Sequence, residues 1–220
     1  MRRFLLLAHK VPPSGAFTLN DLAGGAGRMD EVARAVSTAF TLSNDLRRDT
    51  EFSILFVAEP PPAARRVDIV GARVRFLNPD ERSTAALLKN ALVRSVAFPG
   101  EFESSPGLRV GSVDPTAALA EFVARPGAVW LTEGGRPVGA WPPLGEEVNA
   151  VLSDPFDPTD AEATLLRASG VPALSVGPRS LRSSQVVDLF HAELDRRSPP
   201  APAGAPATGP PAARAPSTGS

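Results

Sequence analysis

One stretch of this chain carries a continuous helical pattern of apolar positions. Between Gly24 and Asp49, apolar side chains recur at intervals of three and four residues, which places them on one face of an α-helix. These positions are Met29, Val32, Ala33, Val36, Ala39 and Phe40. Glu31, Arg34, Thr38 and Thr41 fall on the other side. The pattern therefore predicts about four turns of amphipathic helix with one buried face.

Short apolar runs predict the strands, and turn residues separate them from the helices. The predicted strands are Arg3–Ala8, Thr50–Val57, Leu108–Ser112, Ala128–Thr132, Val148–Ser153 and Pro172–Val176, with a small hairpin over Val67–Leu77. Further helices are predicted to follow Asn78, as a capping residue, and Asp114, and to lie within Asp157–Gly170 and Arg179–Arg197. Because strands and helices alternate, we expect the α/β class with a largely parallel sheet.

Composition excludes several kinds of site and separates a folded part from a tail. The 220 residues contain no cysteine and only two histidines, so neither disulfides nor a metal site is expected. The net charge of −1 indicates that any nucleic acid would bind through a local patch. Residues 198–220 consist mainly of Pro, Ala, Gly, Ser and Thr. We expect one domain over residues 1–197, followed by a disordered tail.

The N-terminus resembles a signal peptide only superficially. Its apolar run, Phe4–Ala8, is shorter than the apolar region of a signal peptide, and His9 and Lys10 follow at once. A buried first strand is the better interpretation. No segment is long enough to span a membrane, so we expect a cytoplasmic protein.

Arginine and aspartate flank the amphipathic helix at both ends. The cluster consists of Arg28 and Asp30 before most of the helix, and Asp45, Arg47, Arg48 and Asp49 after it. Surface salt bridges, worth about 0–1 kcal/mol each, are the simpler explanation, and composition alone favours it. The alternative is a surface that receives a phosphate group and a polar ring.

Sequence motifs of well-known enzyme classes give no assignment. Gly24-Gly25-Ala26-Gly27 precedes a helix but lacks the spacing of a dinucleotide or Walker loop, so a flexible turn is the simpler interpretation. The chain has no Gly-x-Ser-x-Gly or HExxH motif. The acidic run Asp154–Glu162 lacks the central glycine of a calcium-binding loop. Residue chemistry alone thus predicts an α/β domain with an Arg/Asp cluster.

Three blocks of sequence together resemble the archaeal-type tRNA pseudouridine-54 N1-methyltransferases, a branch of the SPOUT superfamily. The blocks are FTLNDLAGGAGRMDEVARAVSTAFTLSNDLRRD at Phe17–Asp49, LNPDERSTAALLKNAL at Leu77–Leu92, and the pair SPG and SVGPRSL at Ser105–Gly107 and Ser175–Leu181. Their order and spacing match along residues 1–197 and leave out only the tail.

This resemblance implies a fold and a cofactor that the residue patterns do not reveal. The implied fold is a parallel sheet flanked by helices, with its C-terminal part threaded into a trefoil knot. The implied assembly is a homodimer that holds S-adenosyl-L-methionine in the knot loops, largely through backbone groups. By position, the residues matching these loops are Leu131, Ser153, Val176, Gly177, Pro178, Arg179, Ser180 and Leu181. The absence of a Rossmann glycine fingerprint is consistent with such binding.

The resemblance also implies RNA as the second substrate. The residues expected to face RNA are Arg28, Arg47, Arg48, Asp80 and Arg82. In the implied reaction, N1 of a pseudouridine attacks the sulfonium methyl group and loses its proton. An ionised aspartate beside an arginine can orient or accept that proton, and Asp30 and Asp45 are the candidates.

One segment departs from the family pattern. The family usually has a stretch of the type His-Ala-Asn/Asp-His after the final loop, where this chain has Arg182-Ser183-Ser184-Gln185. Pro155 follows Asp154 where histidine is common in the family. Two alternatives therefore stand beside methylation of pseudouridine in tRNA. One is a methyltransferase acting on another RNA such as rRNA, and the other is a SPOUT-like RNA-binding module without transfer activity.

Overall fold

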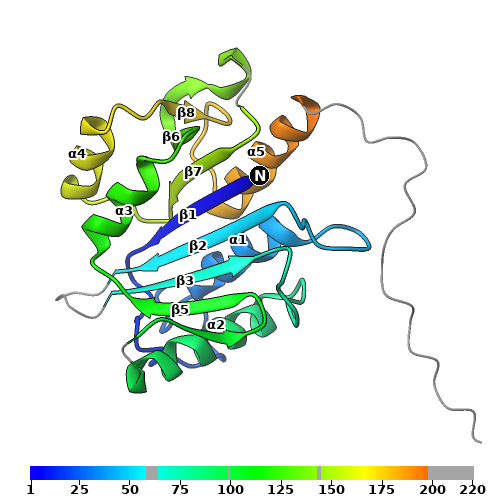
Figure 1. Cartoon of the computed structure of the whole chain (residues 1–220), viewed down its shortest axis with the longest axis vertical. Coiled ribbons are helices and arrows are strands. Elements are labelled where there is room, and N and C mark those ends of the chain that lie inside the picture. Colours follow the sequence, from blue (N-terminus) through cyan, green and yellow to red (C-terminus); the bar gives the residue numbers. More distant parts are fainter. Residues whose placement is uncertain (58–63, 99, 143–144, 198–220) are drawn as a thin grey trace, which may run out of the picture.

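A computed structural model describes residues 1–57, 64–98, 100–142 and 145–197. The predicted tail at 198–220 lies outside the described residues. Within the described part, one sheet runs through the molecule with helices on both of its faces (Figure 1). The order of its strands is β4-β5-β3-β2-β1-β7-β6-β8.

The sheet has a parallel half and an antiparallel half. The strands are β1 Arg2–Ala8, β2 Thr50–Phe56, β3 Arg65–Val70, β4 Phe102–Ser105, β5 Leu108–Ser112, β6 Ala128–Pro137, β7 Val148–Ser153 and β8 Ala173–Ser175. The pairs among β2, β1, β7, β6 and β8 are parallel, as predicted. The pairs that join β3, β5 and β4 to β2 are antiparallel, which differs from the prediction. Short links explain the β2–β3 and β4–β5 pairs, because a parallel crossover needs about a dozen residues or more, and β5 then pairs with β3 after the chain has passed through α2 and β4.

The helices lie in two layers on opposite faces of the sheet. They are α1 Met29–Phe40, α2 Glu81–Ala97, α3 Pro115–Val123, α4 Asp160–Ala168 and α5 Ser183–Arg197, with a short 3₁₀ helix at Val138–Ala140. Phe4 and Leu6 of β1 belong to the core formed with α1, α2 and α5. Leu5 and Leu7 belong to the core formed with α3 and α4. The run is apolar throughout because successive side chains of a strand point to opposite faces and both faces are covered.

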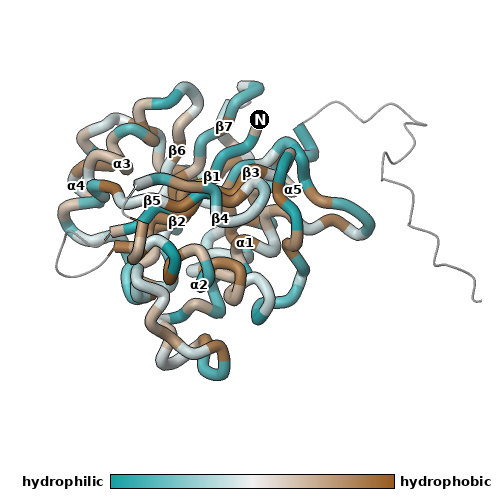
Figure 2. Tube along the Cα trace, turned by 60° about the horizontal axis from the view of Figure 1, so that its bottom comes forward, coloured by the Kyte–Doolittle hydropathy of each residue, from teal (hydrophilic) through white to brown (hydrophobic). Residues whose placement is uncertain are grey.

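The apolar stripe of α1 is buried as predicted. All six positions of the stripe are fully inaccessible to solvent. Each large side chain among them contributes about 1.5–3 kcal/mol by leaving water. Figure 2 shows the hydrophobic colour concentrated on the central strands that these helices cover. None of the helices in the described residues is long and apolar enough to cross a membrane.

Three local predictions are wrong. Val67–Leu77 is not a hairpin: β3 ends at Val70 and pairs with β2 and β5. Asp80, not Asn78, caps α2, because the Asp80 carboxylate accepts the Ser83 N–H at 2.8 Å. The predicted turn after Thr132 is part of β6, which continues to Pro137 with a register irregularity. Gly135 permits this pairing, since a Cβ there would lie 2.5 Å from the Leu174 backbone.

Candidate active site

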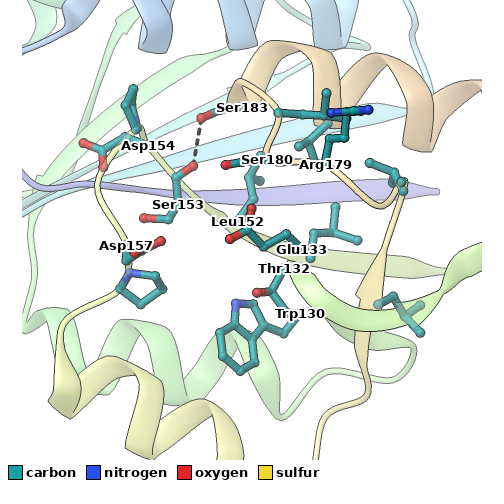
Figure 3. A pocket seen from close by; sticks show the side chains of 18 residues that line it. Trp130, Thr132, Glu133, Leu152, Ser153, Asp154, Asp157, Arg179, Ser180 and Ser183 are labelled. Carbon is teal, nitrogen blue, oxygen red and sulfur yellow. Dashed lines mark hydrogen bonds between the residues drawn. The ribbon is translucent and has the colours of Figure 1, made fainter.

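A hollow opens where the parallel strands β7 and β8 end, beside the middle of β6 (Figure 3). It encloses about 760 Å³, including the open space at its mouth. Leu152, Leu174 and Val176 supply apolar surface, while Asp154, Asp157 and Arg179 supply polar groups. Ligands of open α/β sheets bind outside the carboxyl ends of the strands, so this hollow is the candidate ligand site.

The structure brings the predicted cofactor loops together in this hollow. Three segments that are distant in sequence supply its lining residues: the middle of β6, the end of β7 and the loop between β8 and α5. The predicted residues that line it are Leu131, Ser153, Val176, Gly177, Arg179, Ser180 and Leu181. Pro178 lies in the same loop but is not among the lining residues.

The loop after β8 is anchored at its far end. The Ser183 hydroxyl donates to the Ser153 carbonyl at 2.8 Å, the hydrogen bond drawn in Figure 3. The Arg182 N–H donates to the Gln185 side chain at 3.0 Å, which satisfies a backbone donor at the start of α5. The residues that depart from the family pattern thus hold the final loop against the end of β7.

The packing of the chain does not require a glycine at position 177. Its φ is outside the left-handed region that favours glycine. A Cβ at this position would meet only Leu181 Cδ1, at 4.0 Å. Neither backbone conformation nor neighbouring side chains require glycine there. A bare backbone facing the hollow suits a ligand that approaches the main chain closely.

His9 ties one wall of the hollow to the end of β1. Its Nδ1 lies 3.0 Å from Asp154 Oδ1, and its Nε2 lies 2.9 Å from Glu162 Oε2. The His9 N–H also donates to Asp154 Oδ2 at 2.8 Å. Burial opposes a charge on this ring, but hydrogen bonds to Asp154 and Glu162, reinforced by their charges, raise the pKa of His9 to about 9. His9 is therefore an imidazolium at neutral pH.

No sequence motif marks His9 as a residue of the site. A signal existed, since His9 and Asp154 each follow a buried strand and the carboxyl ends of neighbouring parallel strands meet at one edge. The short distances to both carboxylates are those of charge-assisted hydrogen bonds. Among the described residues, no group of His, Asp and Glu side chains is arranged to hold a metal ion.

We expect His9 to make the stability of the protein depend on pH. The unfolded chain has a histidine pKa near 6.5, so the folded protein binds an extra proton between pH 6.5 and about 9. This contribution is fully present below pH 6.5 and is lost as the pH rises through 9. After allowance for solvent screening, the free energy of unfolding should fall by about 1–2 kcal/mol across that window.

Urea unfolding at a series of pH values measures this effect. His9→Gln keeps a side chain that forms hydrogen bonds but does not titrate, so its stability should not show the histidine-dependent fall. If the unchanged protein and His9→Gln lose stability equally between pH 6.5 and 9.5, the imidazolium assignment is wrong.

A second charged cluster lies beside the hollow at the start of α1. The Arg28 guanidinium donates to both oxygens of Asp30, each at 3.0 Å. Glu31 Oε1 lies 3.3 Å from Arg28 and 3.6 Å from Arg182, and it also accepts a hydrogen bond from the Arg34 guanidinium. Arg182 lies in the chain between Leu181 and Ser183, which both line the hollow. The cluster therefore reaches the rim of the hollow. Arg28 is also coupled electrostatically to Asp154, a lining residue.

Two carboxylates of this cluster are shielded from solvent. Asp30 is 8% exposed and Glu31 is 1% exposed, although the helical pattern placed Glu31 on the polar side. Glu31 Oε2 is buried without a hydrogen-bond partner among the described residues. Burial alone would raise the pKa of Asp30, but hydrogen bonds from Arg28 and the charges of Arg28 and Arg34 hold it below its usual range. Asp30 is therefore ionised at neutral pH and available as an acceptor.

The other half of the predicted Arg/Asp surface lies at the far end of α1. Arg47 forms two hydrogen bonds with Asp195 near the end of α5, at 2.6 and 3.2 Å. Arg48 donates to the Gly71 carbonyl at 3.0 Å and lies 3.2 Å from Asp45. The twelve residues of α1 separate this end from Asp30 by about 18 Å. Within one chain, Asp45 therefore cannot share a site with Asp30, and the two flanks do not form one surface.

Asp80 and Arg82 begin α2 and approach the first cluster from the side. Arg82 donates to the Leu19 carbonyl at 2.8 Å. Their neighbour Glu81 pairs with Arg34 at 2.8 Å, which links α2 to the cluster at the start of α1. The predicted RNA-facing residues therefore divide into two groups: Arg28, Asp80 and Arg82 belong to the hollow side, and Arg47 and Arg48 to the opposite end.

The glycine turn before α1 is not an open phosphate site. The Asp21 carboxylate accepts the N–H groups of Gly24 at 2.9 Å and Gly25 at 2.6 Å. A phosphate could bind at this turn only if these N–H groups were free to donate hydrogen bonds to it. The simpler interpretation of a turn is therefore confirmed.

The fold and the hollow define an α/β protein with a ligand site at the carboxyl ends of its parallel strands. The solved structure of Nep1 from Archaeoglobus fulgidus, bound to S-adenosylhomocysteine, superposes with a TM-score of 0.62 over 88% of this chain and 97% of that chain. Its sequence is only 12% identical, so the likeness concerns the fold. At the level of sequence, the chain belongs to the family described as "Putative SAM-dependent RNA methyltransferase", whose profile matches residues 1–198.

Several curated relatives are similar along nearly the whole chain. A protein of Methanocella arvoryzae is 38% identical over 198 residues, which is 90% of this chain and all of the relative. A protein of Methanocorpusculum labreanum is 39% identical over 202 residues, covering 90% and 98% of the two chains. One of Haloferax volcanii is 38% identical over 197 residues, covering 89% and 96%. Each is named tRNA (pseudouridine(54)-N(1))-methyltransferase.

Proposed function

We propose that this protein transfers a methyl group from S-adenosyl-L-methionine to N1 of the pseudouridine at position 54 of tRNA. The observation that carries the proposal is the similarity to curated relatives with this activity over the whole folded part of the chain. The predicted cofactor loops, which converge on one hollow, support it independently. The departure at Arg182–Gln185 does not oppose it, since these residues anchor the loop.

The hollow suits the proposed cofactor. Leu131, Val176 and Leu181 present apolar surface for a flat base, and the open backbone at Gly177 permits close approach. Ser153, Ser180 and Arg179 add polar groups for the remaining parts of the molecule. When bound, S-adenosyl-L-methionine supplies an electrophilic methyl group on a sulfonium. The protein contributes by holding the two reactants in line, which can account for much of the acceleration.

Asp30 is the residue we assign to the N1–H group of the pseudouridine. It is ionised, sheltered from solvent and fixed by Arg28. General bases work best when their pKa lies near the working pH, and the pKa of Asp30 is low. We therefore propose that Asp30 accepts a hydrogen bond from N1–H and orients the nitrogen, with the proton passing to solvent. Arg28 and Arg182 are held by Asp30 and Glu31, and their side chains are 35% and 64% exposed, so we propose that their outward N–H groups contact the negative groups of the RNA.

The remaining expectations concern assembly and location. We propose that the C-terminal part forms a trefoil knot, as the family resemblance implies. We propose that the protein is a homodimer, as the family resemblance implies. A tRNA substrate makes the cytoplasm the proposed location.

Methylation of defined transcripts tests the function. Purified protein and S-adenosyl-L-methionine are incubated with tRNA carrying pseudouridine or uridine at position 54, and nucleosides are analysed by mass spectrometry. We expect N1-methylpseudouridine only from the first transcript, because N1 of uridine is bonded to the ribose.

Two other results would support one or the other of the two alternative functions. Methylation of rRNA and not of tRNA would redirect the enzyme to another substrate. Calorimetric binding of RNA without binding of S-adenosyl-L-methionine would indicate an RNA-binding module without transfer activity.

A further inference from the structure

Phe76 has an unusual conformation and an unusual exposure. It lies between β3 and α2 with φ at 63°, in the left-handed region that bulky side chains rarely occupy. Its exposed fraction is 72%, the highest of any large hydrophobic residue in the described part of the chain. Both features cost free energy, because the positive φ strains the backbone and the exposed ring loses the stabilisation that burial would give. No internal packing of the described residues accounts for the ring.

The backbone on both sides of Phe76 is held in place. The Val74 N–H donates to the Val70 carbonyl at 2.8 Å, and the Arg75 N–H donates to Pro106 at 3.3 Å. The side chains of Val74 and Leu77 are buried. After Phe76, the Asn78 carbonyl accepts the Thr84 hydroxyl at 3.1 Å and the Pro79 carbonyl accepts the Ser37 hydroxyl at 2.9 Å. The ring therefore projects from an anchored loop.

The loop that carries Phe76 holds one arginine that pairs with no described carboxylate, and two arginines that do pair lie in it or hold it. Arg75 is exposed and forms no ion pair with any described residue. Arg73 is 60% exposed and is paired with Glu103 at 2.8 Å. Arg48, which holds the loop through the Gly71 carbonyl, has a side chain that is 49% exposed. An anionic partner would meet at least one arginine here whose charge is not already neutralised.

We propose that Phe76 is a stacking platform for an unpaired base of the RNA substrate, with Arg75 contacting the adjoining phosphate. The inference rests on the proposed function, because it takes RNA as the partner. Single-stranded bases in RNA are commonly bound by stacking on aromatic side chains. A protein partner would need a larger apolar patch, yet the exposed residues close to Phe76 in sequence include no other large apolar side chain: Arg75, Asn78, Pro79 and Asp80.

The position of Phe76 separates its role from the chemistry. β3 runs antiparallel to β2, which is parallel to β1, so the loop after β3 lies at the edge where β1 begins. The hollow lies at the opposite edge, about 20 Å away along the strands. RNA-binding domains can contact nucleic acid over such lengths. Phe76 should therefore strengthen the binding of RNA without affecting the cofactor or the methyl transfer of bound RNA.

Replacement of Phe76 by glycine tests the proposal. Fluorescence anisotropy with a labelled tRNA transcript should show affinity weaker by about 5- to 100-fold, the effect of losing one stacked base. The melting temperature should be unchanged or higher, because glycine adopts positive φ without strain. Affinity for S-adenosyl-L-methionine and the rate at saturating RNA should be unchanged, and Phe76→Trp should retain RNA affinity.

Phe98→Ala is the matched control. Phe98 is an aromatic residue with 60% exposure at the other end of α2, and its replacement should leave RNA affinity unchanged. Normal RNA affinity in Phe76→Gly would overturn the proposal, as would equal losses in Phe76→Gly and Phe98→Ala. If the unchanged protein binds the transcript and methylates it, the proposed function stands whatever the Phe76 variants do. If the unchanged protein binds no tRNA, both proposals fail.

Discussion

Gly177→Val is expected to abolish binding of S-adenosyl-L-methionine while the protein remains folded. The backbone at Gly177 borders the hollow, and a side chain there would occupy space beside the main chain of the loop. The chain itself accommodates a larger residue, since a Cβ meets only Leu181 at 4.0 Å and the backbone is not left-handed. We therefore expect an affinity at least about 100-fold weaker, or roughly 2.7 kcal/mol, and a nearly unchanged melting temperature.

Calorimetric titration of the cofactor into folded Gly177→Val measures this effect. Gly100→Val is the control, because Gly100 also has open space around its Cβ position but does not line the hollow. The control should bind the cofactor normally. Normal affinity in folded Gly177→Val would remove the loop after β8 from the cofactor site and weaken the methyltransferase assignment.

Asp30→Asn is expected to lower the rate of methyl transfer by about 10- to 150-fold, the effect of losing a hydrogen bond to a charged group worth about 1.5–3 kcal/mol. Asparagine keeps the size of the side chain but removes the charge that Arg28 holds in place. Its amide oxygen can still accept a hydrogen bond from N1–H, but it is neutral, and its amide nitrogen cannot accept from Arg28, so the charge-assisted hydrogen bond and its fixed geometry are lost. Affinity for S-adenosyl-L-methionine should change little, since Asp30 lies beside the hollow and not among its lining residues.

Single-turnover methylation of tRNA with saturating cofactor measures the Asp30 effect. Asp45→Asn is the comparison, because Asp45 was the other candidate from sequence and lies beyond the far end of α1. We expect its rate to stay within a few-fold of the unchanged protein. A larger loss in Asp45→Asn than in Asp30→Asn would reverse the assignment and indicate that residues beyond one chain complete the site.

The sequence was a good guide where burial alone decides the structure. The stripe of α1 was predictable because a helix that packs on one side needs apolar residues at fixed spacing. Strands β1, β2, β5 and β7 were predictable within one or two residues for the same reason. β4 was not, because Phe102 is its only large apolar residue and it depends on pairing with β5. Pairing is a property of two segments, so one segment does not reveal it.

The cofactor loops show how resemblance and local chemistry differ. Gly177 and Ser153 have no local pattern that marks them as binding residues, and only the family blocks assigned them. The structure then places them around one hollow, because β6, β7 and β8 are parallel and the ends of β7 and β8 lie beside the middle of β6. Resemblance thus supplied the assignment, and topology supplied the proximity.

By itself, the sequence determined the α/β class, the buried faces of the helices and the family, because each depends on the order of residues along the chain. Only the tertiary structure decided which charges meet. It separated Asp30 from Asp45 by the length of α1, buried Glu31 among arginines, and joined His9 to Asp154 and Glu162 across the sheet. Ionic and hydrogen-bonded contacts act over a few ångströms, and residues 145 positions apart reach that range only when strands pair.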